Sequence, residues 1–182
     1  MANEAHKYNL PITAHATSKK AVKNCVEAGF DCLEHATFWI DQNQKSLVSS
    51  KLAKKMEREN IFVDMTIQAS YRAVTENANL LNENEYNDRK TKLEDTLNVF
   101  SKLRKYNIRF VSGSDAGFRS NPIGDLPLGL ELMVENGMKE NEALKTATSN
   151  AANFFNVQGK VGSIEKGKFA DVIVTRNNPL EN

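Results

Sequence analysis

Short apolar runs alternate along the chain with longer stretches in which apolar residues recur every three or four positions. The short runs have the length of buried strands, and the longer stretches have the periodicity of helices with one buried face. The predicted strands span 10–16, 31–36, 61–67 and 108–117. Strands that alternate with helices favour βα units, so the pattern predicts an α/β fold with a parallel sheet.

The same pattern predicts the helices. The first helix ends at Gly29, and one of its faces carries Ala21, Val22, Cys25 and Val26. A second helix precedes the last strand, and one of its faces carries Leu93, Leu97, Phe100 and Leu103. The other predicted helices span 46–59, 126–136 and 140–155. We expect a long polar connection after the third strand. Turn residues and a β-branched run predict a small all-β element at the end, so the expected domains are 1–157 and 158–182.

Three polar side chains lie where predicted strands end: His15, His35 and Asp115. The carboxyl ends of parallel strands meet at one edge of a sheet, so these side chains are expected near one another. Imidazole and carboxylate groups bind a hydrolytic zinc-like ion, which needs about three protein ligands and an open position for water. A lone histidine here is more often a hydrogen-bonding residue, and an aspartate in "GSDAG" also fits a turn or a helix cap. Their recurrence at successive strand ends favours a site assembled by the fold.

The composition is that of an ordinary globular protein, with 182 residues, 40% hydrophobic content and a formal net charge of +1. Basic residues are scattered among acidic ones, which argues against a nucleic-acid partner. No apolar run approaches the roughly 18 residues of a membrane span, and the N-terminus lacks the apolar stretch of a signal peptide. We therefore expect a cytoplasmic protein with no membrane partner. Cys25 and Cys32 lack metal-ligand spacing and are expected to be small buried residues.

An ordered set of motifs covers nearly the whole chain. The strand ends "ITAHA", "EHA" and "GSDAG" resemble the fifth, sixth and eighth barrel strands of the amidohydrolase superfamily. The tail, "GMKENEALKTATSNAANFF" and then "GSIEKGKFADVIV", resembles the closing helices and returning strands of its imidazolonepropionase-like and Xaa-Pro dipeptidase-like branch. The resemblance implies an α/β fold: the C-terminal half (strands five to eight) of a TIM-like (β/α)8 metal-dependent hydrolase barrel, plus a short β-sandwich segment.

The resemblance also implies a role for each strand-end residue. His15 would be a metal ligand, His35 a ligand or a group that polarises the substrate, and Asp115 a metal ligand and general base. The implied cofactor is a divalent metal, zinc first, although manganese, iron and cobalt also accept these ligands and half a barrel is also compatible with no metal. Residues that follow the strand ends are candidates for contact with a small-molecule substrate: Phe38, Trp39, Gln68, Tyr71, Phe118 and Arg119.

Parts of the family pattern are missing. The chain has only three histidines and no H-x-H pair, which the family's metal site takes from its first strand. It also has strands for only half of a barrel of about 250 residues. The outer strands of such a half would present open edges. This predicts a homo-oligomer through those edges or a separate N-terminal half as partner, with a flatter, rearranged sheet as the third possibility.

Two functions stay open on the sequence. The first is a metal-dependent amidohydrolase that cleaves C–N bonds of small cyclic amides or Xaa-Pro-like dipeptides, inactive without the missing half. The second is a non-catalytic half barrel or truncated gene product that acts only in folding or association. In an intermediate case, His15, His35 and Asp115 alone hold one metal ion.

Overall fold

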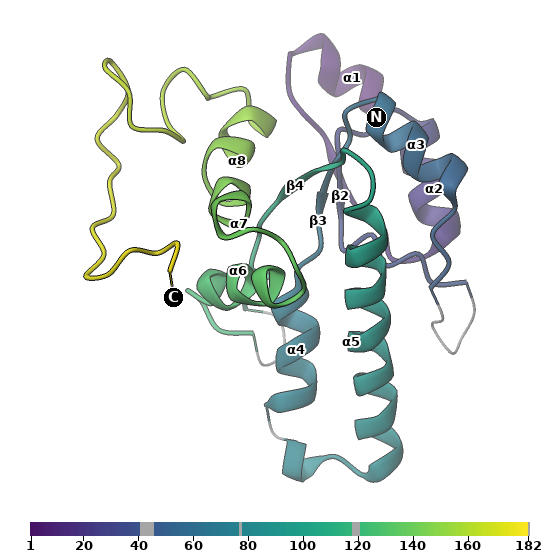
Figure 1. The fold of residues 1–182 in the computed structure, drawn as a ribbon. Coiled ribbons are helices and arrows are strands. Elements are labelled where there is room, and N and C mark those ends of the chain that lie inside the picture. Colours follow the sequence, from purple (N-terminus) through teal and green to yellow (C-terminus); the bar gives the residue numbers. More distant parts are fainter. Residues whose placement is uncertain (41–45, 77, 118–120, 182) are drawn as a thin grey trace.

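Four short parallel strands form one sheet in the order β1-β2-β3-β4 (Figure 1). The computed structural model describes residues 1–40, 46–76, 78–117 and 121–181. The strands are β1 (Thr13–His15), β2 (Cys32–Glu34), β3 (Phe62–Asp64) and β4 (Arg109–Val111). Helices connect successive strands, which confirms the predicted parallel α/β fold.

Eight α-helices and one 3-10 helix lie in the described part of the chain. They are α1 (Ala2–Lys7), α2 (Lys19–Glu27), α3 (Ser50–Arg58), α4 (Ile67–Thr75), η1 (Ala78–Leu80), α5 (Glu83–Leu103), α6 (Leu126–Glu135), α7 (Glu140–Thr146) and α8 (Ser149–Phe154). None of these described helices is both long and apolar enough to cross a membrane. The longest, α5, begins with a capping box in which Asn82 and Glu85 satisfy each other's backbone amides.

Three predicted elements differ from the observed ones. The polar connection expected after the third strand contains α4 and η1, because the chain turns helical immediately after β3, at Ile67. The predicted helix 140–155 is two helices, since Thr148 has the non-helical angles φ −128° and ψ −95°. The predicted helix 46–59 forms only over Ser50–Arg58.

The two faces of the sheet differ in polarity, because successive side chains of a strand point to opposite faces. The register aligns Leu33, Val63 and Phe110 on one face. This face packs in the main core with buried residues of α2, α3 and α5: Val22, Val26, Ala53, Met56, Val99, Phe100 and Leu103. On the other face, the row nearest the carboxyl ends holds His15 beside Glu34 and Glu34 beside Asp64. The packed face therefore fixes the strands whose polar ends carry the candidate site.

The two edges of the sheet are not equally open. At β4, the Asn150 side-chain amide donates to the Phe110 carbonyl at 2.9 Å, and the Ser112 amide donates to the Thr146 carbonyl at 3.2 Å. Helices α7 and α8 thus cover part of the β4 edge, which corrects the expectation that both outer strands are open. The outer edge of β1 pairs with no strand in the described residues.

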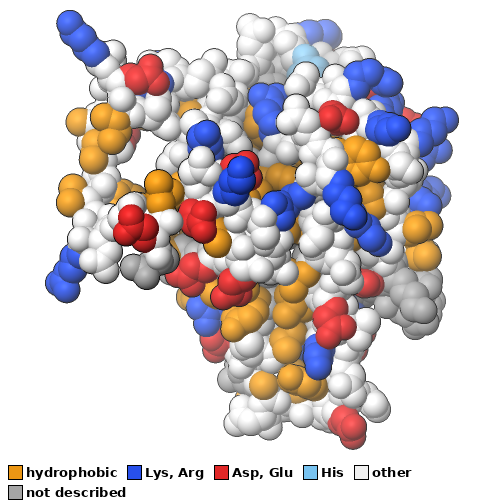
Figure 2. All heavy atoms as spheres, in the orientation of Figure 1, with side chains coloured by type: hydrophobic (Ala, Val, Ile, Leu, Met, Phe, Trp, Pro, Cys, Tyr) orange, Lys and Arg blue, Asp and Glu red, His pale blue; other side chains and the backbone are white. Residues whose placement is uncertain are grey.

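The C-terminal segment after α8 runs extended beside the helices (Figure 1). The strands expected over 158–182 do not form within the described residues 158–181. A strand needs a hydrogen-bonded partner, and no other strand lies against this run. Its apolar side chains are open on the surface (Figure 2), with Ile173 and Val174 each 90% exposed.

Candidate active site

The carboxyl ends of the strands and the helices α4 and α5 line one cavity of about 570 Å³. The strand ends contribute His15, His35, Thr66 and Asp115. The two helices contribute mainly charged residues: Arg72, Glu85, Asp88, Arg89 and Lys92. The cavity thus brings together the three strand-end residues predicted from the sequence, as expected for a parallel sheet.

The imidazoles of His15 and His35 pack edge to face, with ring centroids 4.7 Å apart. Nδ1 of His35 lies 2.7 Å from the hydroxyl of Thr66, and its main-chain amide donates to the Asp64 carbonyl at 2.7 Å. Burial, and then the neighbouring His15, lower the pKa of His35, while Asp115 acts in the opposite direction. His35 therefore favours the neutral imidazole, which is the form that binds a metal ion.

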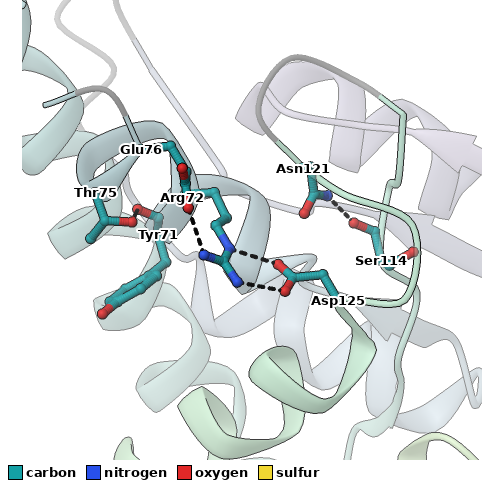
Figure 3. Close-up of polar contacts among 7 residues, drawn as sticks. All are labelled: Tyr71, Arg72, Thr75, Glu76, Ser114, Asn121 and Asp125. Atoms are coloured by element: carbon teal, nitrogen blue, oxygen red, sulfur yellow. Dashed lines mark hydrogen bonds and ion pairs between the residues drawn. The ribbon is translucent and has the colours of Figure 1, made fainter. Parts of the chain in front are cut away.

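Asp115 lies in the turn after β4 and is exposed toward the cavity. Its φ of 49° falls in the left-handed region, which is uncommon for a residue with a side chain. The side chain of Asn121 donates from Nδ2 to the Ser114 carbonyl (Figure 3). It also donates to the Asp115 carbonyl, at 3.1 Å. The amide of Gly117 donates to the main-chain carbonyl of Asn121 at 2.9 Å. These bonds close the turn that presents Asp115.

The buried carboxyl group of Asp64 contacts the backbone at the carboxyl ends of the strands. Asp64, on β3, is 5% exposed and accepts a hydrogen bond from the amide of Thr66 at 2.9 Å. Burial raises the pKa of Asp64 well above its ordinary value. A Cβ atom at Gly113 would overlap Oδ2 of Asp64, so a larger residue at this position would force the buried carboxyl group to shift.

Charged side chains on the helix wall are largely paired with one another. Arg72 binds Asp125 with Nε and Nη2 at 2.9 and 2.7 Å, and binds Glu76 with Nη1 at 2.7 Å (Figure 3). The guanidinium lowers the pKa of Asp125, chiefly through these hydrogen bonds. On α5, Lys92 lies 2.6 Å from Asp88.

The predicted substrate contacts have mixed positions. Trp39 lines the cavity, whereas Phe38 is fully buried in the core. Gln68 is 2% exposed and donates to the Gly113 carbonyl at 2.7 Å, and Tyr71 packs against the core. Neither Gln68 nor Tyr71 belongs to the described wall of the cavity. Phe118 and Arg119 lie outside the described residues.

Sequence reasoning missed Thr66, Arg72, Asn121 and Asp125. The strand-end rule applied to "FVDMT" would have indicated Asp64 and Thr66, because these two polar residues lie toward the carboxyl end of the third predicted strand. No comparable signal marks Arg72 and Asp125, since the contact between them depends on how α4 and α6 lie in space.

The residues fit a metal ion only in part. His15 and His35 offer two neighbouring imidazoles, and Asp115 lies in the same cavity. However, the described residues contain no group of three His, Cys, Asp or Glu side chains arranged to hold an ion. This differs from the expected ion site of His15, His35 and Asp115 alone.

The chain is similar in sequence and in fold to known proteins. The amidohydrolase family profile matches residues 1–181. The ochratoxinase of Aspergillus niger is 25% identical over 183 residues, covering 100% of this chain and 35% of that protein. A crystal structure of a Xaa-Pro dipeptidase with methionine in its active site superposes with a TM-score of 0.82 and 26% identity, over 100% of this chain and 42% of that one. The A. niger ochratoxinase structure gives a TM-score of 0.80 at 24% identity, over 100% of this chain and 38% of that one. This chain spans well under half the length of these relatives, and it belongs to the amidohydrolase family.

Proposed function

We propose that this chain supplies His15, His35 and Asp115 to a metal-dependent site that hydrolyses C–N bonds of small amides, either cyclic amides or Xaa-Pro-like dipeptides. One observation carries the proposal: side chains of these three kinds, from three different strand ends, line a single cavity. A volume of about 570 Å³ lies in the range of small-molecule sites. The likeness to a Xaa-Pro dipeptidase supports the dipeptide class.

The chain's own residues suggest a division of roles. His15 and His35 offer two neighbouring imidazole nitrogens as metal ligands. A divalent metal ion, zinc in the first instance, would lower the pKa of a bound water molecule to about 7. Asp115 provides the carboxylate that accepts a proton from the attacking water. Thr66 fixes the ring of His35 through Nδ1, so Nε2 is the nitrogen directed to ligation.

We further propose that the site is completed by a second polypeptide segment that pairs with the outer edge of β1. Most hydrolytic zinc sites have three protein ligands, whereas the described residues hold no three such side chains arranged around an ion. The β4 edge is partly covered by Asn150 and Thr146, whereas among the described residues no strand pairs with the outer edge of β1. Turnover therefore requires this second segment, supplied by a separate N-terminal half or by another copy.

The ligand assignment is tested by titrating cobalt(II) into the labelled 182-residue chain and following its histidine ring signals by NMR. His6 is an internal control, because it lies on α1, pairs with Asp31 at 2.9 Å and is not part of the cavity wall. We expect the signals of His15 and His35 to broaden at a lower cobalt concentration than the signal of His6, and Asp115→Ala to weaken this preference. Equal broadening of all three rings would contradict the assignment.

Hydrolysis is tested with the chain joined behind the N-terminal part of the similar Xaa-Pro dipeptidase, which completes the barrel. Zinc-loaded chimera is expected to release proline from Ala-Pro, whereas its Asp115→Asn variant and the 182-residue chain alone are not. A folded, metal-loaded chimera without turnover would count against the hydrolytic role. Turnover by the chain alone, lost in Asp115→Asn, would show that no second segment is needed.

A further inference from the structure

Arg72 lines the cavity, yet carboxylates of the protein already engage its guanidinium. Nε and Nη2 donate to the two oxygens of Asp125, and Nη1 donates to Glu76. An arginine on a cavity wall is ordinarily a candidate for binding an anionic ligand. Here the fork that would bind such a ligand is occupied, so Arg72 acts on the protein itself.

We propose that Arg72 is a positioning residue for Asp115, acting through Asp125 and Asn121 on the backbone that follows β4. The reactive role of Asp115 rests on the proposed function. The contacts that hold Asp115 in place do not depend on it.

Asp115 requires such support because its backbone is strained. A φ of 49° is a sparsely populated conformation for aspartate, and it persists only when neighbouring contacts fix it. Strain of this kind at a cavity wall aims the side chain in a direction that relaxed backbone would not allow. If the supporting contacts are lost, the turn that carries Asp115 should therefore become mobile while the sheet stays folded.

Asn121 supplies the near support. It is 4% exposed, and its Nδ2 donates to the Ser114 carbonyl (Figure 3) and to the Asp115 carbonyl. Because both acceptors are carbonyls, they fix which end of the amide is the donor. The two peptide groups on either side of the Asp115 Cα are thereby held in place.

Asp125 supplies the far support. It precedes α6, is 8% exposed, and receives the two-pronged bond from Arg72 of α4. A bidentate arginine–carboxylate pair fixes orientation as well as distance, and a lysine cannot reproduce it. Arg72 thus ties the segment that carries Asp115 and Asn121 to the helix that follows β3.

The test compares Arg72→Gln, Arg72→Lys and Asp125→Asn in the 182-residue chain. Arg58→Gln is the matched control, because Arg58 also binds a carboxylate, Glu59, but on the exposed surface of α3. Amide exchange and amide chemical shifts are recorded by NMR for 112–117 and, as reference, for β1 and β2. We expect exchange of the Gly117 amide, which donates to the Asn121 carbonyl, to accelerate about tenfold in Arg72→Gln and Arg72→Lys. The amide shifts of Ser114 and Asp115 should change with it, while β1 and β2 stay unchanged.

A second readout separates positioning from general stability. Cobalt broadening of the His35 ring is measured for Arg72→Lys in the wild-type and Asp115→Ala backgrounds. If Arg72 acts through Asp115, the substitution weakens the response in the first background and has no further effect in the second. Equal weakening in both backgrounds would overturn the proposal.

The exchange experiment also stands without metal binding. If the wild-type chain shows no preference for His15 and His35, the proposed function fails, while the exchange data still decide whether Arg72 holds Asp115. Wild-type exchange of the Gly117 amide and wild-type amide shifts of Ser114 and Asp115 in Arg72→Lys would overturn the inference. A uniform acceleration across all strands would do the same.

Discussion

The two walls of the cavity use their polar groups in opposite ways. On the strand-end wall, His15 and Asp115 are exposed, and the His35 ring is hydrogen-bonded to the neutral hydroxyl of Thr66. On the helix wall, Arg72 and Lys92 are paired with carboxylates of the protein. Groups that can act on a ligand therefore gather where the sheet ends, and the helices serve to hold that edge in place.

The largest effect is expected at the base of the strand-end wall. Gly113→Ala would drive a Cβ into the buried carboxyl of Asp64, and overpacking of this kind costs about 2–3 kcal/mol. Gly159→Ala is the control, because a Cβ there meets nothing within 4 Å. Urea unfolding of both variants measures the difference. Similar stability of the two would show that Asp64 moves aside easily.

A smaller loss is expected from the contact between Thr66 and His35. Thr66→Val keeps the shape of the side chain but removes the partner of Nδ1, and an unpaired polar atom costs about 1–2 kcal/mol. Thr91→Val removes a hydroxyl that bonds to its own helix on the exposed surface of α5, so it should change little. If both variants lose the same free energy of unfolding, the His35 contact has no special weight.

The lowered pKa of His35, on the strand-end wall, predicts that the stability of the fold depends on pH. Because the folded state lowers this pKa below the ordinary value of 6.5, the unfolded chain binds the proton more readily. The contribution of His35 to the free energy of unfolding is fully present above pH 6.5 and is lost as the pH falls through the lowered folded-state pKa. Urea unfolding in the presence of a chelator between pH 8 and pH 5 tests this. His35→Asn should flatten the profile, and an unchanged profile would assign the loss to other groups.

The smallest effect is expected on the helix wall. Lys92→Ala removes a pair between residues one helical turn apart, and such pairs contribute about 0.3–0.5 kcal/mol. The loss should shrink further in high salt, because salt screens exposed charges. If Lys92→Ala lowers the free energy of unfolding as much as Gly113→Ala does, the two walls of the cavity do not differ in their contribution to stability.

The sequence was sufficient for the sheet and for part of the site. Apolar runs mark the strands directly, and the rule that parallel strands end at one edge brings His15, His35 and Asp115 together. Helix α4 was missed because Ile67 follows β3 so closely that the apolar run reads as one strand. The strands expected near Val174 depend on a partner, so local β propensity alone did not form them.

The contacts that orient the site were beyond sequence reasoning. Arg72 and Asp125 lie 53 residues apart, and nothing local to either residue indicates the other. Asn121 looks like an ordinary loop residue until the turn closes on Ser114 and Asp115. Such contacts follow from the packing of helices, which periodicity does not specify.

The cluster of left-handed residues at the strand ends has a consequence for how this protein tolerates change. His35, Thr66 and Asp115 all have positive φ values, as do Ala36 and Phe38. Glycine or asparagine would adopt the conformation of Asp115 at lower cost, and Asn121 holds this turn through backbone carbonyls, so a library selected only for heat resistance should accumulate them at this position. The same replacements would remove the carboxylate from the strand-end wall of the cavity. Evolution for robustness and evolution for activity thus pull this edge of the sheet in opposite directions.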